Sequence, residues 1–210
     1  MPAAAARRTE VTDRLRRLVP GELDVEQAAL YDAIAGGPRA SGPQHFALAD
    51  AVGALEGPFG LMLHAPGIGV PLQELGAAIR YRTSLSDRHR EIAILLVAVA
   101  TSSEFEWHAH TRVGLAAGLS ADELSDLAAG SFAPLDPVEA SVVAVCRDVL
   151  DDAVPDEQEY AARRAILGER TLLELVALVG YYRTLASMLA FFTVATPRDE
   201  RSAALPSLRP

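Results

Sequence analysis

One stretch in the middle of the chain decides the fold: Glu91-Ile-Ala-Ile-Leu-Leu-Val-Ala-Val-Ala100, followed by Ser103-Glu-Phe-Glu106-Trp-His-Ala-His110. The first run is apolar nearly all round, which is typical of a helix buried among other helices. In the second run Ser103, Glu106 and His110 have the spacing i, i+3 and i+7, so they share one face of a helix. A carboxylate at the head of a buried helix, close to an imidazole, suits proton transfer near neutral pH.

Helical periodicity extends over nearly the whole chain, and alternating β patterns are scarce. The sequence predicts an all-α, single-domain helical bundle of about eight to ten helices. Its core motifs occupy residues 57–130, an N-terminal extension covers 1–56, helices in 131–197 pack on the core, and 198–210 form a tail. The expected helices cover residues 9–19, 24–35, 45–55, 58–64, 71–81, 87–101, 104–118, 121–130, 137–152, 156–167 and 171–194.

Short polar motifs predict where several of these helices begin and end. Asp24 is the expected N-cap of the second helix, and Ser84-Leu-Ser-Asp87 and Ser120-Ala-Asp-Glu123 both have the spacing of a capping box. Pro66-Gly67 is expected to end the helix that Pro58 opens.

Composition excludes several classes of protein. The net charge of −9 argues against nucleic acid as a partner, because binding phosphates needs a basic surface. No apolar stretch approaches the ~20 residues that span a bilayer, and the N-terminus becomes charged too early for a signal peptide. The single cysteine, Cys146, excludes an intrachain disulfide and a CxxC redox pair. We expect a soluble cytoplasmic protein with no membrane partner.

The residue types that the chain lacks also limit its chemistry. There is no lysine and no asparagine, and all 19 basic residues are arginine. Schiff-base catalysis, a pyridoxal-phosphate lysine and a P-loop lysine are therefore excluded. No glycine-rich dinucleotide motif follows a strand-like segment. Catalysis would depend on Glu, Asp, His, Tyr, Ser and Arg.

The middle of the chain resembles the carboxymuconolactone decarboxylase-like family, which includes the alkyl hydroperoxidase D-like proteins. The resemblance rests on three motifs: Arg88-His-Arg-Glu91-Ile-Ala-Ile-Leu, Phe105-Glu106-Trp107-x-x-His110 and Ala117-Gly118-Leu119-Ser120. It implies an all-helical protomer, a ring-like homo-oligomer and cofactor-free chemistry on a small lactone or carboxylate.

The chain departs from the hydroperoxidase branch of that family, in which two cysteines and a histidine follow a glutamate. When the chain is aligned with that pattern, Glu91 corresponds to the glutamate and His110 to the histidine. Ser103 and Glu106 then occupy the two cysteine positions. Neither residue can form a disulfide or a sulfenic acid. The chain therefore resembles the cysteine-free decarboxylase branch, which relies on acid–base groups.

The sequence suggests a role for each candidate site residue. We expect His110 to transfer the proton because imidazole titrates closest to working pH, Glu106 to orient it, and Glu91 to supply a second carboxylate. The candidate substrate-binding residues are Trp107, Ser103, Arg88 and Tyr182.

Each of these assignments has a plainer alternative. Glu106 and His110 could form an exposed i, i+4 pair with no further role. Glu91 could be a carboxylate favoured by the helix N-terminus and paired with Arg88. Trp107 could be a core residue. We expect no metal: His108 and His110 point about 200° apart on a helix, and Glu106 with His110 supplies too few ligands. His108 is expected at an interface or on the surface.

The leading functional hypothesis is a cofactor-independent, decarboxylase-type lyase acting on a small carboxylated lactone or related acid. Alternatives are an isomerase, cyclase or dehydratase on the same scaffold, a hydroperoxidase using Cys146, and a non-catalytic oligomeric ligand-binding protein. We also expect a homo-oligomer, a trimer or a hexamer, because the last helix carries more apolar surface than one bundle buries. The residues behind that expectation are Leu185, Met188, Leu189, Phe191 and Phe192.

Overall fold

The computed structural model describes residues 13–37, 45–197 and 207–208, and these residues form helices and loops with no named strand. An isolated bridge joins Ala49 and Leu55. The prediction of an all-α fold is confirmed. The elements of the described residues are a 3₁₀ helix, η1 (Pro20–Glu22), and the α-helices α1 (Val25–Ala35), α3 (Pro58–Met62), α4 (Pro66–Tyr81), α5 (Asp87–Ala100), α6 (Glu104–Ala116), α7 (Ala121–Ala129), α8 (Pro137–Leu150) and α9 (Glu157–Phe191).

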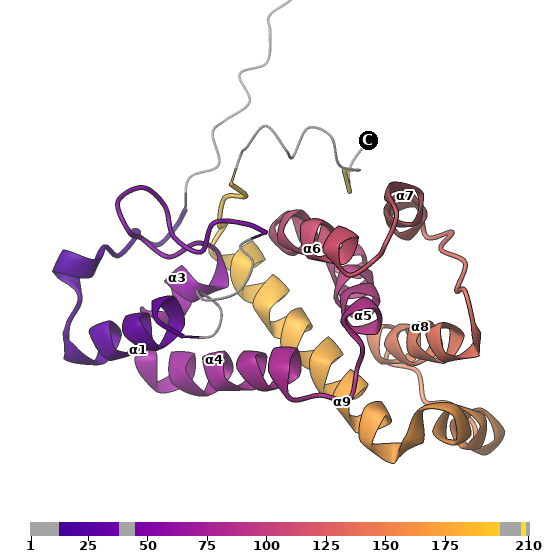
Figure 1. Ribbon diagram of the computed structural model, residues 1–210. Coiled ribbons are helices and arrows are strands. Elements are labelled where there is room, and N and C mark those ends of the chain that lie inside the picture. Colours follow the sequence, from indigo (N-terminus) through magenta and orange to yellow (C-terminus); the bar gives the residue numbers. More distant parts are fainter. Residues whose placement is uncertain (1–12, 38–44, 198–206, 209–210) are drawn as a thin grey trace, which may run out of the picture.

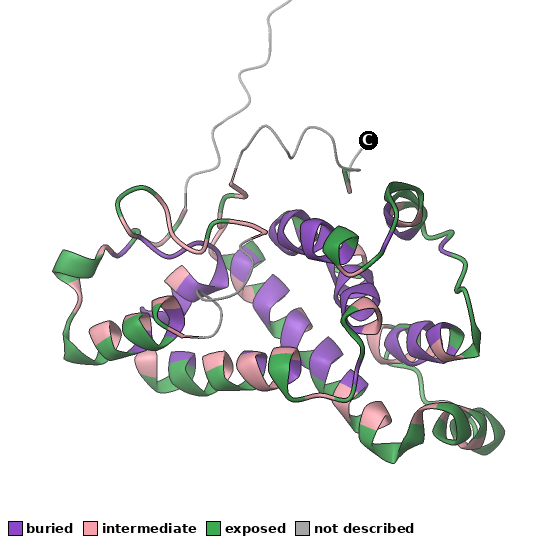
Figure 2. Ribbon diagram, in the orientation of Figure 1, coloured by how far each residue is buried: buried purple, intermediate pink, exposed green. Residues whose placement is uncertain are grey.

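Helix α9 runs diagonally through the middle of the structure (Figure 1). Helices α1, α3 and α4 lie on one side of it, and α5, α6, α7 and α8 lie on the other. Helix α5 packs against α6, α7, α8 and α9. Figure 2 shows that burial is concentrated on α5, α6, α8 and the C-terminal half of α9. A polar side chain that α5 turns toward α6 or α9 is therefore enclosed by protein.

Helix α5 is the buried helix that its apolar run predicts. Every residue from Ile92 to Ala98 is buried. The helix begins at Asp87 as expected, but the cap is Ser86, whose hydroxyl accepts a hydrogen bond from the backbone N–H of His89. The expected capping box from Ser84 is wrong, because the Ser84 hydroxyl instead donates to Glu174 on α9.

Helix α6 is also enclosed, with every residue from Phe105 to Gly114 buried. A Cβ atom at Gly114 would lie 2.9 Å from Leu119 and 3.4 Å from Leu95. The small residue is thus needed for a close approach within the protomer.

Other predicted helix boundaries are confirmed by their hydrogen bonds. Asp24 caps α1 and forms a capping box with Gln27. Ser120 and Glu123 form the expected box at the start of α7, which ends at the left-handed Gly130 (φ 74°). In α9 the left-handed Gly168 (φ 76°) interrupts the helix between the two segments that the sequence predicts as separate helices.

Three predictions in the N-terminal half are wrong over the described residues. Residues 13–19 are not helical; the Arg14 backbone N–H bonds instead to the Phe192 carbonyl. Residues 45–55 form bends and turns, because an Asp50 carboxylate oxygen accepts the backbone N–H groups of two following residues and so favours a turn. Pro66 begins α4 instead of ending a helix, since proline fits the first helical position.

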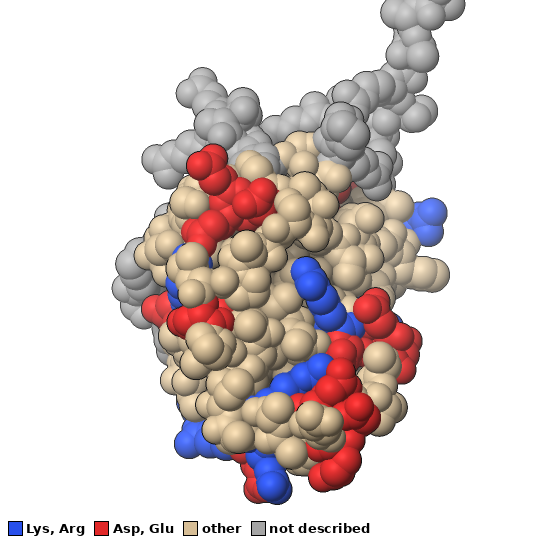
Figure 3. Space-filling model, turned by 90° about the vertical axis from the view of Figure 1, so that its right-hand side faces the viewer, with Lys and Arg blue, Asp and Glu red and all other residues tan. Residues whose placement is uncertain are grey.

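By length and composition alone, α9 could cross a membrane, which differs from the expectation that no such stretch exists. Its most apolar window is 44% buried inside the structure, and α3, α4, α5 and α8 pack against the helix. Contacts with these four helices are typical of a core helix. Core helices can be as long and as apolar as membrane-spanning helices, so length and composition do not distinguish the two. Charged side chains of both signs are spread over the face drawn in Figure 3, with uncharged surface between them.

Candidate functional site

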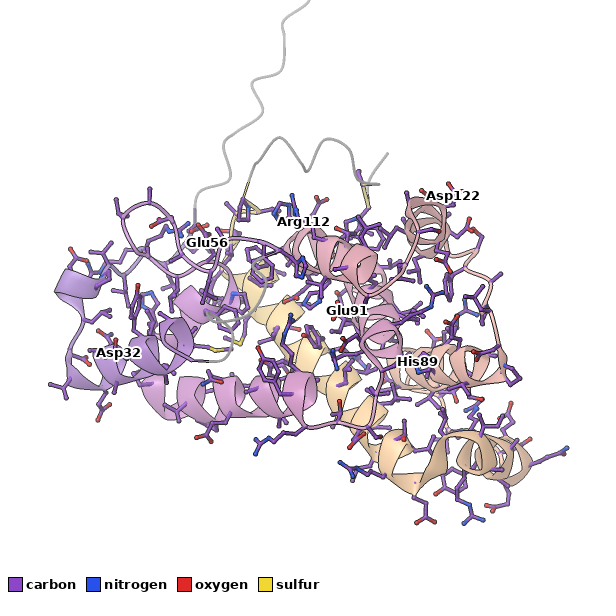
Figure 4. The ribbon with its side chains drawn as sticks, viewed as in Figure 1. Asp32, Glu56, His89, Glu91, Arg112 and Asp122 are labelled. Carbon is purple, nitrogen blue, oxygen red and sulfur yellow. The ribbon has the colours of Figure 1, made fainter. Side chains whose placement is uncertain are left out.

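The centre of the candidate site is a hydrogen bond between α5 and α6. The Oε2 atom of Glu91 lies 2.7 Å from the Nδ1 atom of His110. Helix α5 carries Glu91 one turn after its N-terminus, in the middle of the structure (Figure 4). Helix α6, packed against α5, turns the imidazole toward the carboxylate.

Glu106 lies at the other nitrogen of the same ring. Its Oε2 atom is 3.5 Å from the Nε2 atom of His110, one turn along α6. The exposed fractions are 0% for Glu91, 3% for Glu106 and 6% for His110. The alternative of an exposed i, i+4 pair is therefore excluded. The imidazole bridges two buried carboxylates, and we call Glu91, His110 and Glu106 the buried triad.

Two tyrosines of α9 complete the wall beside the imidazole. The ring of Tyr182 meets the His110 ring edge to face, with centroids 5.3 Å apart, and Tyr181 meets Tyr182 in the same way. Both tyrosines are buried. Aromatic walls keep water away from the imidazole and strengthen its electrostatic contacts.

A small cavity opens beside Glu106, and its volume is about 30 Å³. Glu106 is the member of the buried triad that lines it, whereas the Glu91 side is closed. The rest of the lining is aromatic or aliphatic: Phe46, Pro58, Phe59, Phe105, Ala109, Tyr181, Tyr182 and Leu185. The volume holds water but not an organic ring, so a ligand with a ring would fit only if side chains of the lining moved.

Arg88 does not lie at this site, contrary to the prediction that it binds substrate. Its Nε atom donates to Glu139 on α8 at 2.6 Å, and its Nη2 atom donates to Glu123 on α7 at 2.5 Å. The hydrogen bonds to Glu123 and Glu139 raise the pKa of Arg88 above its usual value. The hydrogen bond from Arg88 lowers the pKa of Glu123 to about 2. This ion-pair cluster holds α5, α7 and α8 together.

Two other predicted substrate-binding residues stand apart from the cavity. Ser103 is the N-cap residue of α6, not part of its helical stripe, and its backbone N–H bonds to the Ala98 carbonyl. Trp107 belongs to the main hydrophobic core, as its plainer interpretation held. Of the predicted substrate-binding residues, only Tyr182 lines the cavity.

Sequence reasoning missed Arg90 beside the buried triad. Its Nε atom lies 3.9 Å from the Oε1 atom of Glu91, and the residue is 8% exposed. The sequence held a possible signal, since Arg90 directly precedes Glu91, but neighbours in a helix ordinarily point in different directions.

The remaining histidines and the cysteine lie elsewhere. His108 is buried, so of its two expected places the surface is wrong, while a place at an interface stays a prediction; its carbonyl accepts a hydrogen bond from Arg112. His64 is exposed, with Nε2 3.1 Å from the Arg16 carbonyl oxygen. In the ranges that the structure describes, no group of three or more His, Cys, Asp or Glu could hold a metal ion. Cys146 is fully buried, and burial raises its thiol pKa to about 12.

The fold and the buried triad define a helical domain of the alkyl hydroperoxidase D-like type whose ionisable groups, rather than cysteines, surround the histidine. Residues 71–148 match the model of the carboxymuconolactone decarboxylase family, and this part of the chain is a domain of that family. The match runs from α4 into α8 and contains all three members of the buried triad. A comparison with curated proteins found no match, and a comparison with solved structures found none.

Proposed function

We propose that the protein is a cofactor-independent, decarboxylase-type lyase of the cytoplasm, which acts on a small carboxylated lactone or related organic acid. The observation that carries the proposal is the imidazole of His110 held between two buried carboxylates, one of which lines a cavity. A general acid in an enclosed site must be fixed in orientation and kept from bulk water. The buried triad meets both conditions.

The proposed reaction needs one proton from the protein. The bond between the substrate carbon and its carboxylate breaks, CO₂ leaves, and the electron pair moves into the conjugated lactone carbonyl as an enolate. His110 then supplies the proton on Nε2, which reaches the carbon through Glu106 because Glu106, and not His110, lines the cavity, and the carbonyl double bond forms again. The histidine regains a proton from solvent after the product leaves. Glu91, at Nδ1, stabilises the positive charge of the imidazolium before transfer.

A second candidate function is favoured by the lining of the cavity. Among the described residues that line it, Glu106 is the charged one, and no arginine or histidine is present. A substrate carboxylate placed there would lack a cationic partner. An uncharged substrate that undergoes isomerisation, cyclisation or dehydration would fit this lining, and the same proton transfer would serve it.

Measured CO₂ release separates the two candidates. The full-length protein is incubated with carboxymuconolactone and related carboxylated lactones, and CO₂ is followed together with loss of substrate. Release that depends on His110 supports the lyase. Conversion of an uncharged lactone or enol without CO₂ supports the second candidate. No His110-dependent turnover of either class would leave the ligand-binding alternative.

We also propose that the protein forms homo-oligomers, trimers or hexamers. Leu185 and Leu189 are buried within the protomer, so they do not supply an interface as their sequence pattern suggests. The sequence pattern also named Phe191, which is exposed. The other large apolar side chains that α9 exposes are Tyr160, Ile166, Leu173 and Val176. Exposed apolar side chains along one helix favour association. Sedimentation of monomers at micromolar concentration would contradict this proposal.

A further inference from the structure

Arg90 brings a buried positive charge to the closed side of the buried triad. Its Nε atom and the Oε1 atom of Glu91 lie 3.9 Å apart, and neither atom has a hydrogen-bond partner among the described residues. The other end of the guanidinium forms an ion pair with Asp87, whose side chain is largely exposed. A gap of this length between two buried polar atoms suits a bridging water.

Counting charges shows why a cation is needed there. The 2.7 Å contact between Glu91 and Nδ1 requires a proton between the two atoms. A second proton between Nε2 and Glu106 prevents two lone pairs from facing each other. Whichever atoms own these protons, the buried triad has one net negative charge. An unbalanced buried charge is costly. The guanidinium of Arg90 stays protonated in proteins and offsets this charge in part, because its other end is paired with the exposed Asp87.

We propose that Arg90 is a positioning residue that decides on which side of His110 the transferable proton is held. The positive charge beside Oε1 stabilises the negative charge on Glu91 rather than on Glu106. Glu91 then remains an ionised acceptor, and Nδ1 of His110 keeps its proton. The proton that can be transferred is held at Nε2, on the side of Glu106 and the cavity. Arg90 does not line the cavity, so it acts through Glu91 and not on the substrate.

This inference rests on the proposed proton-transfer function, but its test measures a hydrogen bond in the resting protein. Histidine-labelled full-length protein is studied by NMR, and the Nδ1–H signal of His110 is assigned by its loss in His110→Gln. Wild type should show a slowly exchanging Nδ1–H. In Arg90→Gln its exchange with solvent should be about tenfold faster, because a charge-assisted hydrogen bond loses its ionised acceptor.

Two further variants separate charge from structure. Asp87→Asn removes the exposed ion pair of Arg90 and leaves its contact with Glu91, so the signal should remain as in wild type. Arg90→Lys restores the positive charge, so the signal should return at least in part. A purely structural role would change stability without this pattern.

The inference is overturned if Arg90→Gln exchanges at the wild-type rate, or if Arg90→Lys exchanges as fast as Arg90→Gln. It is also overturned if the wild-type protein has no slowly exchanging Nδ1–H, which needs no variant and remains decisive if Arg90→Gln does not fold. Loss of the lyase hypothesis would leave these signals unchanged, so the two proposals fail separately.

Discussion

Glu91 Oε2 and His110 Nδ1 lie 2.7 Å apart, on two helices that each bury their polar member among apolar neighbours. Burying an ionisable pair costs free energy unless each group is well partnered. Aliphatic side chains at these two positions of α5 and α6 would commonly give a fold at least as stable as the one with the ionisable pair. An arrangement that costs stability and lies next to a cavity is typical of a functional site.

His110→Asn should lower the proposed turnover by a factor of about 10² to 10⁴, since a general acid commonly contributes that much. The amide cannot gain and lose a proton at working pH. Initial rates of CO₂ release or of substrate conversion measure the effect, and circular dichroism checks that the helices remain. His89→Gln is a matched control, because His89 lies on α5 outside the site. Equal turnover in His110→Asn and wild type would remove the catalytic assignment.

Glu91→Gln and Glu106→Gln should affect the kinetics differently. Glu91 does not line the cavity, so its replacement should lower kcat about tenfold or more with KM nearly unchanged. Glu106 lines the cavity, so its replacement should change both constants. Steady-state kinetics on the same substrate gives both values. A change of KM alone in Glu91→Gln would place that residue in substrate binding instead.

Cys146 should not react in the folded protein, which tests the hydroperoxidase alternative. Its side chain is fully buried and its pKa is raised to about 12, so almost no thiolate is present at neutral pH. Ellman's reagent should label it only after unfolding in guanidinium. Cys146→Ala should retain the proposed turnover. Rapid labelling of the native thiol, or thiol-dependent peroxide turnover, would revive the alternative.

The sequence predicted those parts of the fold that depend on local signals. The apolar run after Glu91 and the capping boxes of α1 and α7 act within one or two helical turns, so they could be read directly. Residues 13–19 could not be predicted in this way, because their backbone bonds to a segment at the other end of the chain. Pro66 was misread since proline both ends and begins helices, and only the packing of the neighbouring segments decides between the two.

The candidate site was predicted in its composition and only partly in its geometry. Spacing placed Glu106 and His110 on one face of a helix, and the family resemblance added Glu91. From the sequence, Arg88 is a better candidate than Arg90 for a cation near Glu91, because residues three apart share a helix face and adjacent residues do not. The structure separates them, because Glu123 and Glu139 on other helices bind Arg88, while Arg90 stays beside Glu91. Such choices depend on long-range contacts that periodicity does not encode.

Gly57→Ala should destabilise the protein by about 2–4 kcal/mol, through overpacking and a strained backbone. Gly57 has a φ of 60°, and a Cβ atom there would overlap the ring of Phe105, which lines the cavity. Urea unfolding at pH 7 measures the change. Gly67→Ala is the matched control, since nothing lies within 4 Å of a Cβ there and its helical position favours alanine. Equal stability of the two variants would show that α3 and α6 adjust to each other freely.

The ion-pair cluster of Arg88 should make part of the stability depend on acid pH. Arg88 lowers the pKa of Glu123 from about 4.5 to about 2 in the folded protein. Because the folded value is the lower one, the stabilisation is fully present above pH 4.5 and is lost as the pH falls toward 2. Glu123→Gln should therefore cost about 1–3 kcal/mol at pH 7, and the difference from wild type should shrink at pH 3. Urea unfolding at several pH values tests this, with Glu169→Gln as control because its pair with Arg164 is exposed and should contribute under about 0.5 kcal/mol. A Glu123→Gln difference that does not change between pH 7 and pH 3 would mean that the carboxylate charge is not what joins α5 to α7.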